Sequence, residues 1–167
     1  HFMFILPPVF VFIALAFQVL FERLRRPWAA GLLLVGTLLP GVIALVSLHP
    51  YQYTYYNSLV GGTGGAFRRY ETDYWLTCYR ELMGDLNQSV PEGSTLFVYR
   101  QPSIVDSYAA PGLNIERYDP DDDQTFSGSL LLLTTRSNVD LTNYPEAPEL
   151  LSVGRDGAVF CLVREIP

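Results

Sequence analysis

The 167-residue chain contains no lysine and only two histidines, two cysteines and two methionines. All eleven of its basic residues are therefore arginines, and seventeen acidic residues outnumber them, giving a formal net charge of −6. Eight of the arginines and sixteen of the acidic residues follow residue 50, so this part of the chain carries a charge of −8. A nucleic-acid groove needs a basic stripe. The acidic tail therefore excludes nucleic acid as an expected partner.

The scarcity of cysteine and histidine also excludes several kinds of site. Cys78 and Cys161 do not form a C-x-x-C metal motif. His1 and His49 are too far apart in the sequence to suggest a catalytic pair, and no serine stands in a G-x-S-x-G motif. The acidic run 121–123 lacks the spacing of an EF-hand and is interpreted as a solvated loop. No metal or cofactor site is evident in this chain.

The first 50 residues have little charge and long apolar runs instead. Residues 2–21 and 28–48 are uncharged, and each run has about the 20 residues that a helix needs to cross a membrane. The segment between them, 22–27, carries three arginines and one glutamate. Short arginine-rich loops stay on the cytoplasmic side. The pattern therefore predicts two transmembrane helices with a cytoplasmic loop, a lipid bilayer as partner and an extracytoplasmic C-terminal domain. Two helices buried in a large soluble core are the less favoured alternative.

Prolines interrupt both apolar runs, at Pro7-Pro8 and at Pro40-Gly41. Transmembrane helices tolerate such interruptions where neighbouring helices satisfy the freed carbonyl groups. The chain also begins at His1 without an initiator methionine. We therefore expect the N-terminal transmembrane helices of the same protein to precede this segment.

Residues 49–72 are rich in tyrosine and glycine. Tyrosines close to a membrane exit suit the aromatic belt at the level of the lipid headgroups. The glycines of the 61–65 stretch permit tight turns or a close approach between backbones. We expect an interfacial linker here.

Residues 73–167 alternate between helical and strand patterns. Thr72 is expected to cap a helix that begins at Asp73. The apolar face of this helix comprises Trp75, Cys78, Tyr79, Leu82, Leu86 and Val90. Further elements are expected as strands at 95–99, 114–118 and 130–135, a short helix at 103–110, a helical turn at 139–144, and a hairpin of 150–153 and 158–164. The predicted fold is a transmembrane helical hairpin followed by a small α/β domain, with a mainly parallel sheet and an antiparallel edge hairpin.

The two cysteines allow two interpretations. A disulfide is possible in an extracytoplasmic domain. Cys78 and Cys161 also stand in apolar patterns, so two buried free thiols are at least as compatible with the sequence. Both alternatives stay open at this point.

The segment 70–75 is the most interesting polar cluster, because Glu71 and Asp73 stand among three aromatic residues. Aromatic rings stack on sugar faces, and carboxylates accept hydrogen bonds from sugar hydroxyls. The structural alternative is that Asp73 stabilises a helix N-terminus and that Trp75 belongs to the core. His1 has two interpretations as well: a contact with an anionic lipid phosphate, or an interfacial position without a role.

The run from His1 to Pro8, and more specifically the segment from His49 to Trp75, resemble bacterial GT-C-class glycosyltransferases. This class includes protein mannosyltransferases and aminoarabinose transferases. The resemblance covers roughly residues 1–85 and implies transfer of a sugar from a polyprenyl-phosphate donor to an extracytoplasmic acceptor. It places the catalytic aspartate in a first extracytoplasmic loop outside this chain, so the fragment alone is expected to be inactive. The candidate substrate-binding residues are His1, His49, Tyr51, Tyr55, Asn57, Glu71, Asp73 and Tyr74.

A function of another class is also compatible with the sequence: a non-enzymatic, membrane-anchored binding or sensor module. The two functions predict different sequences upstream of His1. The enzyme needs several more membrane helices, whereas a sensor needs few helices and a cytoplasmic signalling domain.

Overall fold

The computed structural model describes residues 6–24, 26–121 and 126–167. It divides the chain into two compact units, His1–Ala44 and Leu45–Pro167. His1 and the aspartates at 122 and 123 lie outside the described residues.

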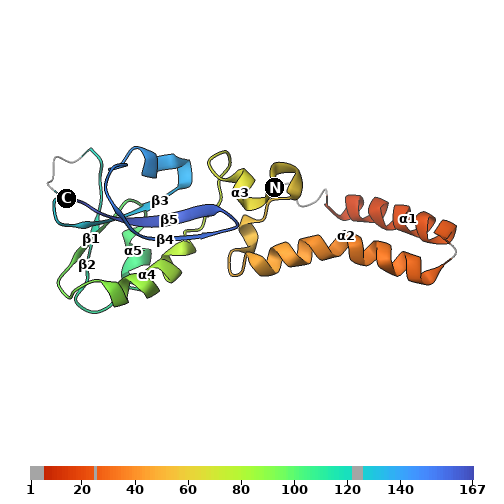
Figure 1. Cartoon of the computed structure of the whole chain (residues 1–167), viewed down its shortest axis with the longest axis horizontal. Helices are drawn as coiled ribbons and strands as arrows, with labels where there is room; N and C mark the ends of the chain where they lie inside the picture. Colours follow the sequence, from red (N-terminus) through yellow and green to blue (C-terminus); the bar gives the residue numbers. More distant parts are fainter. Residues whose placement is uncertain (1–5, 25, 122–125) are drawn as a thin grey trace. The chain divides into compact units, whose positions relative to one another are not determined.

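The first unit contains the two apolar helices, α1 (Leu6–Leu24) and α2 (Pro27–Ser47) (Figure 1). Both helices are long and apolar enough to cross a membrane. Pro7 and Pro8 lie in the first turn of α1, where backbone amides have no partner within the helix. Pro40 lies inside α2, which continues unbroken through it. The predicted helical hairpin is confirmed, although residues 2–5 of its first expected helix are not described.

The second unit contains all the strands and the shorter helices. The short helical segments are η2 (Gln52–Thr54), η3 (Ser58–Val60), α3 (Gly62–Ala66), α5 (Pro102–Asp106) and η4 (Arg136–Leu141), and the one longer helix is α4 (Cys78–Ser89). The strands are β1 (Thr95–Val98), β2 (Asn114–Arg117), β3 (Leu130–Thr134), β4 (Glu149–Arg155) and β5 (Ala158–Glu165).

The five strands form one mixed sheet in the order β2-β1-β3-β5-β4. Strand β1 is parallel to both of its neighbours, pairing Val98 with Arg117 of β2 and with Leu132 of β3. Strand β5 runs antiparallel to β3 and forms a hairpin with β4. This arrangement confirms the predicted parallel sheet with an antiparallel edge hairpin.

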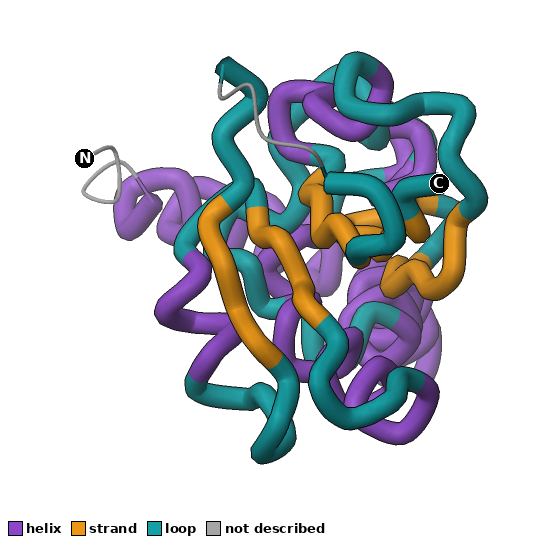
Figure 2. The backbone as a smooth tube through the Cα atoms, turned by 90° about the vertical axis from the view of Figure 1, so that its left-hand side faces the viewer, coloured by secondary structure: helices purple, strands orange, loops and turns teal. Residues whose placement is uncertain are grey.

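Each face of the sheet has its own hydrophobic cluster. On one face, α4 and α5 pack against the strands around the fully buried side chains of Leu82, Leu96 and Leu132 (Figures 1 and 2). On the other face, Phe97 and Phe126 pack edge to face, with ring centroids 4.7 Å apart. The strands β1 and β3 contribute to both clusters, as expected for central strands whose side chains alternate between the two faces.

Residues 49–72, expected as an interfacial linker, belong to the second unit. The Tyr51 side chain is fully buried and packs on Phe160 of β5, with ring centroids 4.9 Å apart. A β-carbon on Gly64 would lie 2.3 Å from the carbonyl oxygen of Asp156, in the turn between β4 and β5. The glycine-rich stretch therefore permits the close backbone approach that the sequence suggests. Segment 51–66 thus contributes buried residues to the domain, Tyr51, Thr54, Thr63 and Ala66, while Leu59 is 93% exposed.

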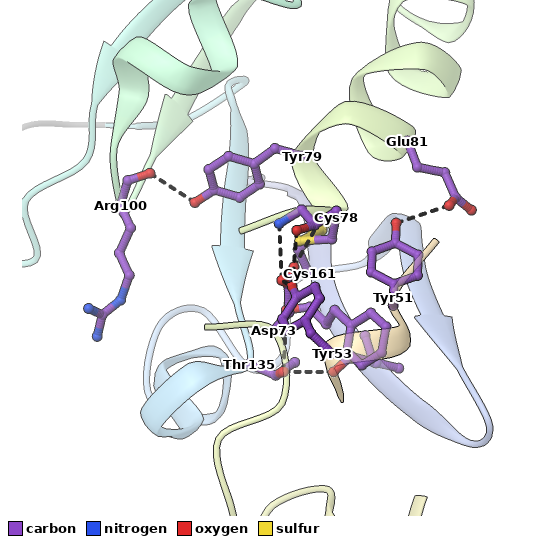
Figure 3. The surroundings of a disulfide bond; sticks show 12 residues. Tyr51, Tyr53, Asp73, Cys78, Tyr79, Glu81, Arg100, Thr135 and Cys161 are labelled. Atoms are coloured by element: carbon purple, nitrogen blue, oxygen red, sulfur yellow. Dashed lines mark hydrogen bonds between the residues drawn. A yellow bond between two sulfur atoms is a disulfide. The ribbon is translucent and has the colours of Figure 1, made fainter. Parts of the chain in front are cut away.

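Helix α4 begins at Cys78, five residues later than predicted. Leu76 has a left-handed backbone (φ +58°), which is incompatible with a helix starting at Asp73. The Asp73 carboxylate instead accepts hydrogen bonds from the amides of Thr77 and Cys78, at 3.0 and 2.9 Å (Figure 3). Asp73 thus supports the N-terminus of α4 from outside the helix.

The same helix N-terminus carries a disulfide. Cys78 is bonded to Cys161 of β5, across a sequence separation of 83 residues, as Figure 3 shows. Both cysteines are fully buried. Of the two interpretations that the sequence allows, the structure supports the disulfide.

Candidate functional site: a groove at the ends of the parallel strands

An open groove of about 720 Å³ lies at the carboxyl ends of the parallel strands. Its walls come from four separate segments: residues 74–76 before α4, residues 99–102 after β1, residues 117–121 at the end of β2, and Arg136 after β3. No neighbouring pair of these segments is close in the sequence. The sheet topology brings the three strand ends together, and the turn before α4 adds residues 74–76.

The position of the groove follows a general rule for open α/β sheets. The connection from β1 to β2 passes through α5, which packs with the α4-side cluster through Val105. The connection from β2 to β3 places Phe126 in the cluster on the opposite face. The connection that follows β1 and the connection that precedes β3 therefore pass over opposite faces of the sheet. In open α/β sheets, ligands bind in the crevice outside the carboxyl ends of the strands at such a switch point.

The groove contains an exposed aromatic platform made of Trp75 and Tyr74. Trp75 is 72% exposed and Tyr74 is 48% exposed. The two rings meet edge to face, with centroids 5.1 Å apart and planes at 83°. The sequence pattern wrongly placed Trp75 on the buried face of α4. The left-handed backbone of Leu76 buries the leucine and leaves the preceding tryptophan in solvent.

Arg136 forms one wall of the groove and is fixed from two sides. Its guanidinium lies over the Tyr74 ring, 4.0 Å from the centroid. Its Nε lies 2.6 Å from Glu71 Oε2 in an ion pair. Arg136 also lines a second hollow of about 150 Å³, next to Arg68 and Asn138. Glu71 therefore reaches the groove indirectly, by holding the arginine that packs on Tyr74.

Two positions beside the groove have strained backbones. Leu76 and Gln101 both adopt left-handed conformations, with φ of +58° and +49°. Neither is a glycine or an asparagine, so each conformation costs on the order of 1–3 kcal/mol. Strained residues cluster at ligand sites in folded proteins. Leu76 and Gln101 place two such positions on separate walls of the groove, and five other non-glycine residues with positive φ lie elsewhere in the described chain.

Tyr118 closes the inner side of the groove and belongs to the core. Its side chain is only 6% exposed, and its hydroxyl donates to Asn143 Oδ1 at 3.0 Å. Burial, assisted by the neighbouring hydroxyls of Tyr144 and Tyr99, raises the pKa of Tyr118 above its usual value. Tyr118 therefore remains a neutral hydrogen-bonding group at physiological pH.

Of the candidate residues from the sequence, Tyr74 lines the groove and Glu71 acts through Arg136. Three others lie exposed outside the residues that line it: His49, Tyr55 and Asn57. His49 Nδ1 is 2.8 Å from Gln52 Nε2, and Asn57 Oδ1 accepts a bond from the amide of Leu59 at 3.0 Å. His1 lies outside the described residues.

The remaining two candidates, Tyr51 and Asp73, are structural. Tyr51 donates a hydrogen bond to Glu81 Oε2 at 2.9 Å, and Glu81 in turn pairs with Arg155 at 2.7 Å. Burial, together with the Glu81 carboxylate, raises the pKa of Tyr51. Asp73 is only 4% exposed, and its carboxylate is occupied by backbone amides and by the hydroxyl of Tyr53. Burial raises the pKa of Asp73 although these amide bonds oppose the shift.

Sequence reasoning missed most of the groove. Arg100, Arg117 and Arg136 each follow or end one of the three parallel strands. Side chains at that position of parallel strands meet at one edge of the sheet, so the strand prediction itself contained the signal. Among the described ranges 6–24, 26–121 and 126–167, no three histidine, cysteine or carboxylate side chains gather to hold a metal ion.

Comparison with known proteins identifies no family for this chain. No protein-family model matches the chain. No curated protein and no solved structure matches it either. The groove and the two apolar helices are therefore the observations from which a function is argued.

Proposed function

We propose that this chain is the C-terminal part of an integral-membrane glycosyltransferase, and that the groove holds the acceptor. The enzyme moves a sugar from a polyprenyl-phosphate donor to an extracytoplasmic acceptor. The observation that carries the proposal is the exposed Trp75–Tyr74 platform beside arginine and aspartate side chains. Exposed aromatic rings stack on sugar rings, and the charged side chains form hydrogen bonds with the hydroxyl groups of the same ligand.

Two further observations support the membrane topology of this proposal. The helices α1 and α2 are each apolar and long enough to span a bilayer. The disulfide between Cys78 and Cys161 suits an oxidising compartment. A cytoplasmic loop at 22–27 and an extracytoplasmic second unit satisfy both observations at once.

The chain contributes positioning rather than proton transfer in this proposal. An aspartate in the upstream part of the protein acts as base toward the acceptor hydroxyl. The acceptor oxygen displaces the polyprenyl phosphate at the anomeric carbon. The groove raises the rate by holding the acceptor in a reactive orientation. The upstream membrane helices supply the donor cavity.

The test is the effect of Trp75→Ala on the intact membrane protein, assayed with a polyprenyl-phosphate sugar. We expect the KM for the acceptor to rise about tenfold, because the variant loses about one aromatic stacking contact. The KM for the donor should be unchanged. Tyr108→Ala is the matched control, because Tyr108 is also exposed (42%) but does not line the groove.

An unchanged acceptor KM in a folded Trp75→Ala variant would show that the groove does not bind the acceptor. Absence of any sugar transfer by the intact protein would overturn the enzyme assignment. Saccharide binding without transfer would leave the alternative function, a membrane-anchored binding module.

A further inference from the structure

The groove brings three arginines together in a domain that is acidic as a whole. Three arginines line the groove, Arg100, Arg117 and Arg136, together with two aspartates, Asp119 and Asp121, and Arg136 is paired with Glu71. The chain after residue 50 carries −8, from eight arginines and sixteen acidic residues. The acidic surface repels an anionic ligand in general, and guanidinium groups offset this repulsion locally at the groove.

Two of the three arginines have no acidic partner among the residues that the structure describes. Among the described residues, the ion pairs within 4.0 Å join Arg68, Arg136 and Arg155 to carboxylates, and neither Arg100 nor Arg117 takes part in one. Asp119 Oδ1 accepts the amide of Asp121 at 3.1 Å within their loop. In the described parts of the chain, the Arg100 and Arg117 guanidinium groups therefore line the groove without a paired carboxylate.

Arg100 also has a buried donor without a partner. Its Nε has no hydrogen-bond acceptor within the described part of the chain. Its backbone is held in place, since the carbonyl oxygen accepts the Tyr79 hydroxyl at 2.8 Å. The side chain points away from Tyr79 (Figure 3), and its guanidinium lies 5.3 Å from the Tyr99 ring centroid. An oxygen atom of a ligand in the groove would supply an acceptor for this donor.

The strand pairing places the second arginine beside the first. Arg117 ends β2 and pairs with Val98 of β1, two residues before Arg100. The amide of Tyr118 donates to the Val98 carbonyl at 3.0 Å, which fixes the two chain ends side by side. Planar guanidinium groups bind phosphate and carboxylate oxygens through paired hydrogen bonds.

We propose that the groove selects saccharides that carry a negative charge, with Arg100 and Arg117 binding a phosphate or carboxylate group while Trp75 stacks on the sugar ring. This inference rests on the proposed acceptor role of the groove and names the chemical class of the acceptor. The shared chemistry is an oxyanion on the glycan, whether it belongs to a phosphorylated sugar or to a uronic acid.

The test is binding of the whole chain, in detergent micelles, to an array of matched glycans. Each neutral oligosaccharide is printed beside the same oligosaccharide carrying a phosphate and beside its uronic-acid form. We expect at least tenfold stronger binding to one or both charged members of a pair. The phosphate and uronate positions then show which oxyanion the groove prefers.

Variants assign the preference to the two arginines. Arg100→Gln and Arg117→Gln are each expected to weaken binding to the charged glycan roughly tenfold, with less than a twofold change for the neutral one. Arg100→Lys keeps the charge but loses the paired donors, so an intermediate affinity is expected. Arg80→Gln is the control, because Arg80 is an exposed arginine of α4 that does not line the groove. An intact disulfide and an unchanged circular dichroism spectrum establish that each variant is folded.

The two proposals fail differently. Equal binding to the neutral and charged members overturns the charge selection and leaves the acceptor role intact. If both glutamine variants still prefer the charged glycan, Arg100 and Arg117 are not the residues that select it. Failure to bind any glycan overturns the charged-acceptor inference together with the acceptor role of the groove.

Discussion

The carboxylate of Asp73 accepts the backbone amide of Cys78 at 2.9 Å, so the residue that starts α4 is held both by this bond and by the disulfide. Asp73 also accepts the amide of Thr77 at 3.0 Å. Replacing a capping carboxylate usually costs about 1 kcal/mol of stability. We expect Asp73→Asn to lower the free energy of unfolding by about this amount, since the asparagine side chain can accept only one of the two amides. Urea denaturation at neutral pH measures it.

The contribution of Asp73 also depends on pH, with a definite sign. Burial raises its pKa in the folded state above the usual value of 3.8. The folded protein therefore binds more protons than the unfolded chain between the two pKa values, and stability decreases as the pH rises through that interval. The stability advantage of the wild type over Asp73→Asn should be larger below pH 3.8 than at neutral pH. An advantage that grows with pH would contradict the burial argument.

Removing the disulfide should destabilise the second unit strongly. Closing a loop of 83 residues limits the unfolded chain, and the loop-entropy relation gives about 4–5 kcal/mol. We expect Cys78→Ala/Cys161→Ala, and the wild type under reducing conditions, to lose this amount in chemical denaturation. Similar stability with and without reductant would show that the bond contributes little.

The glycines of the second unit offer a matched pair of substitutions. Gly64→Ala would place a β-carbon 2.3 Å from the Asp156 carbonyl oxygen, so segment 51–66 would have to move off the β4–β5 turn. A loss of about 2–3 kcal/mol is expected, as for other overpacked sites. Gly84 lies inside α4 with no atom within 4 Å of an added β-carbon, and Gly84→Ala should stabilise the protein by up to about 1 kcal/mol. Thermal melts of the two variants should therefore shift in opposite directions.

Two buried tyrosines should make the fold sensitive to alkali. Burial raises the pKa of both Tyr51 and Tyr79 well above the usual value of 10. Above pH 10 the unfolded chain loses these protons while the folded protein keeps them, so stability falls by about 1.4 kcal/mol per pH unit for each tyrosine. Tyr79→Phe should reduce this slope. Denaturation series between pH 9 and 11 compare the slopes.

The order of strands and helices was accessible from the sequence because its signals are local. The apolar run of β3 and the Asp156-Gly157 turn of the β4–β5 hairpin each predict their element without reference to the rest of the chain. The packing of residues 51–66 was not accessible. Gly64 lies against Asp156, which is 92 residues later in the sequence. The sequence around either residue contains no signal that predicts this contact.

The groove was hidden for a related reason. Trp75 stands three residues before Cys78, which fits a helical apolar face, and the left-handed turn at Leu76 has no glycine or asparagine to mark it. Arg100, Arg117 and Arg136 stand at or just after the ends of three strands, which the sheet order brings to one edge. A strand prediction without that order cannot show which loops are neighbours.

The bond between Cys78 and Cys161 closes most of the domain into a covalent ring. The exposed turn at Pro111-Gly112 lies within this ring, between Arg100 and Arg117. A single proteolytic cut there would therefore leave both arginines in one molecule, and two fragments would separate only after reduction. Nicking would open the chain without dividing the domain, and the two walls of the groove would stay tethered.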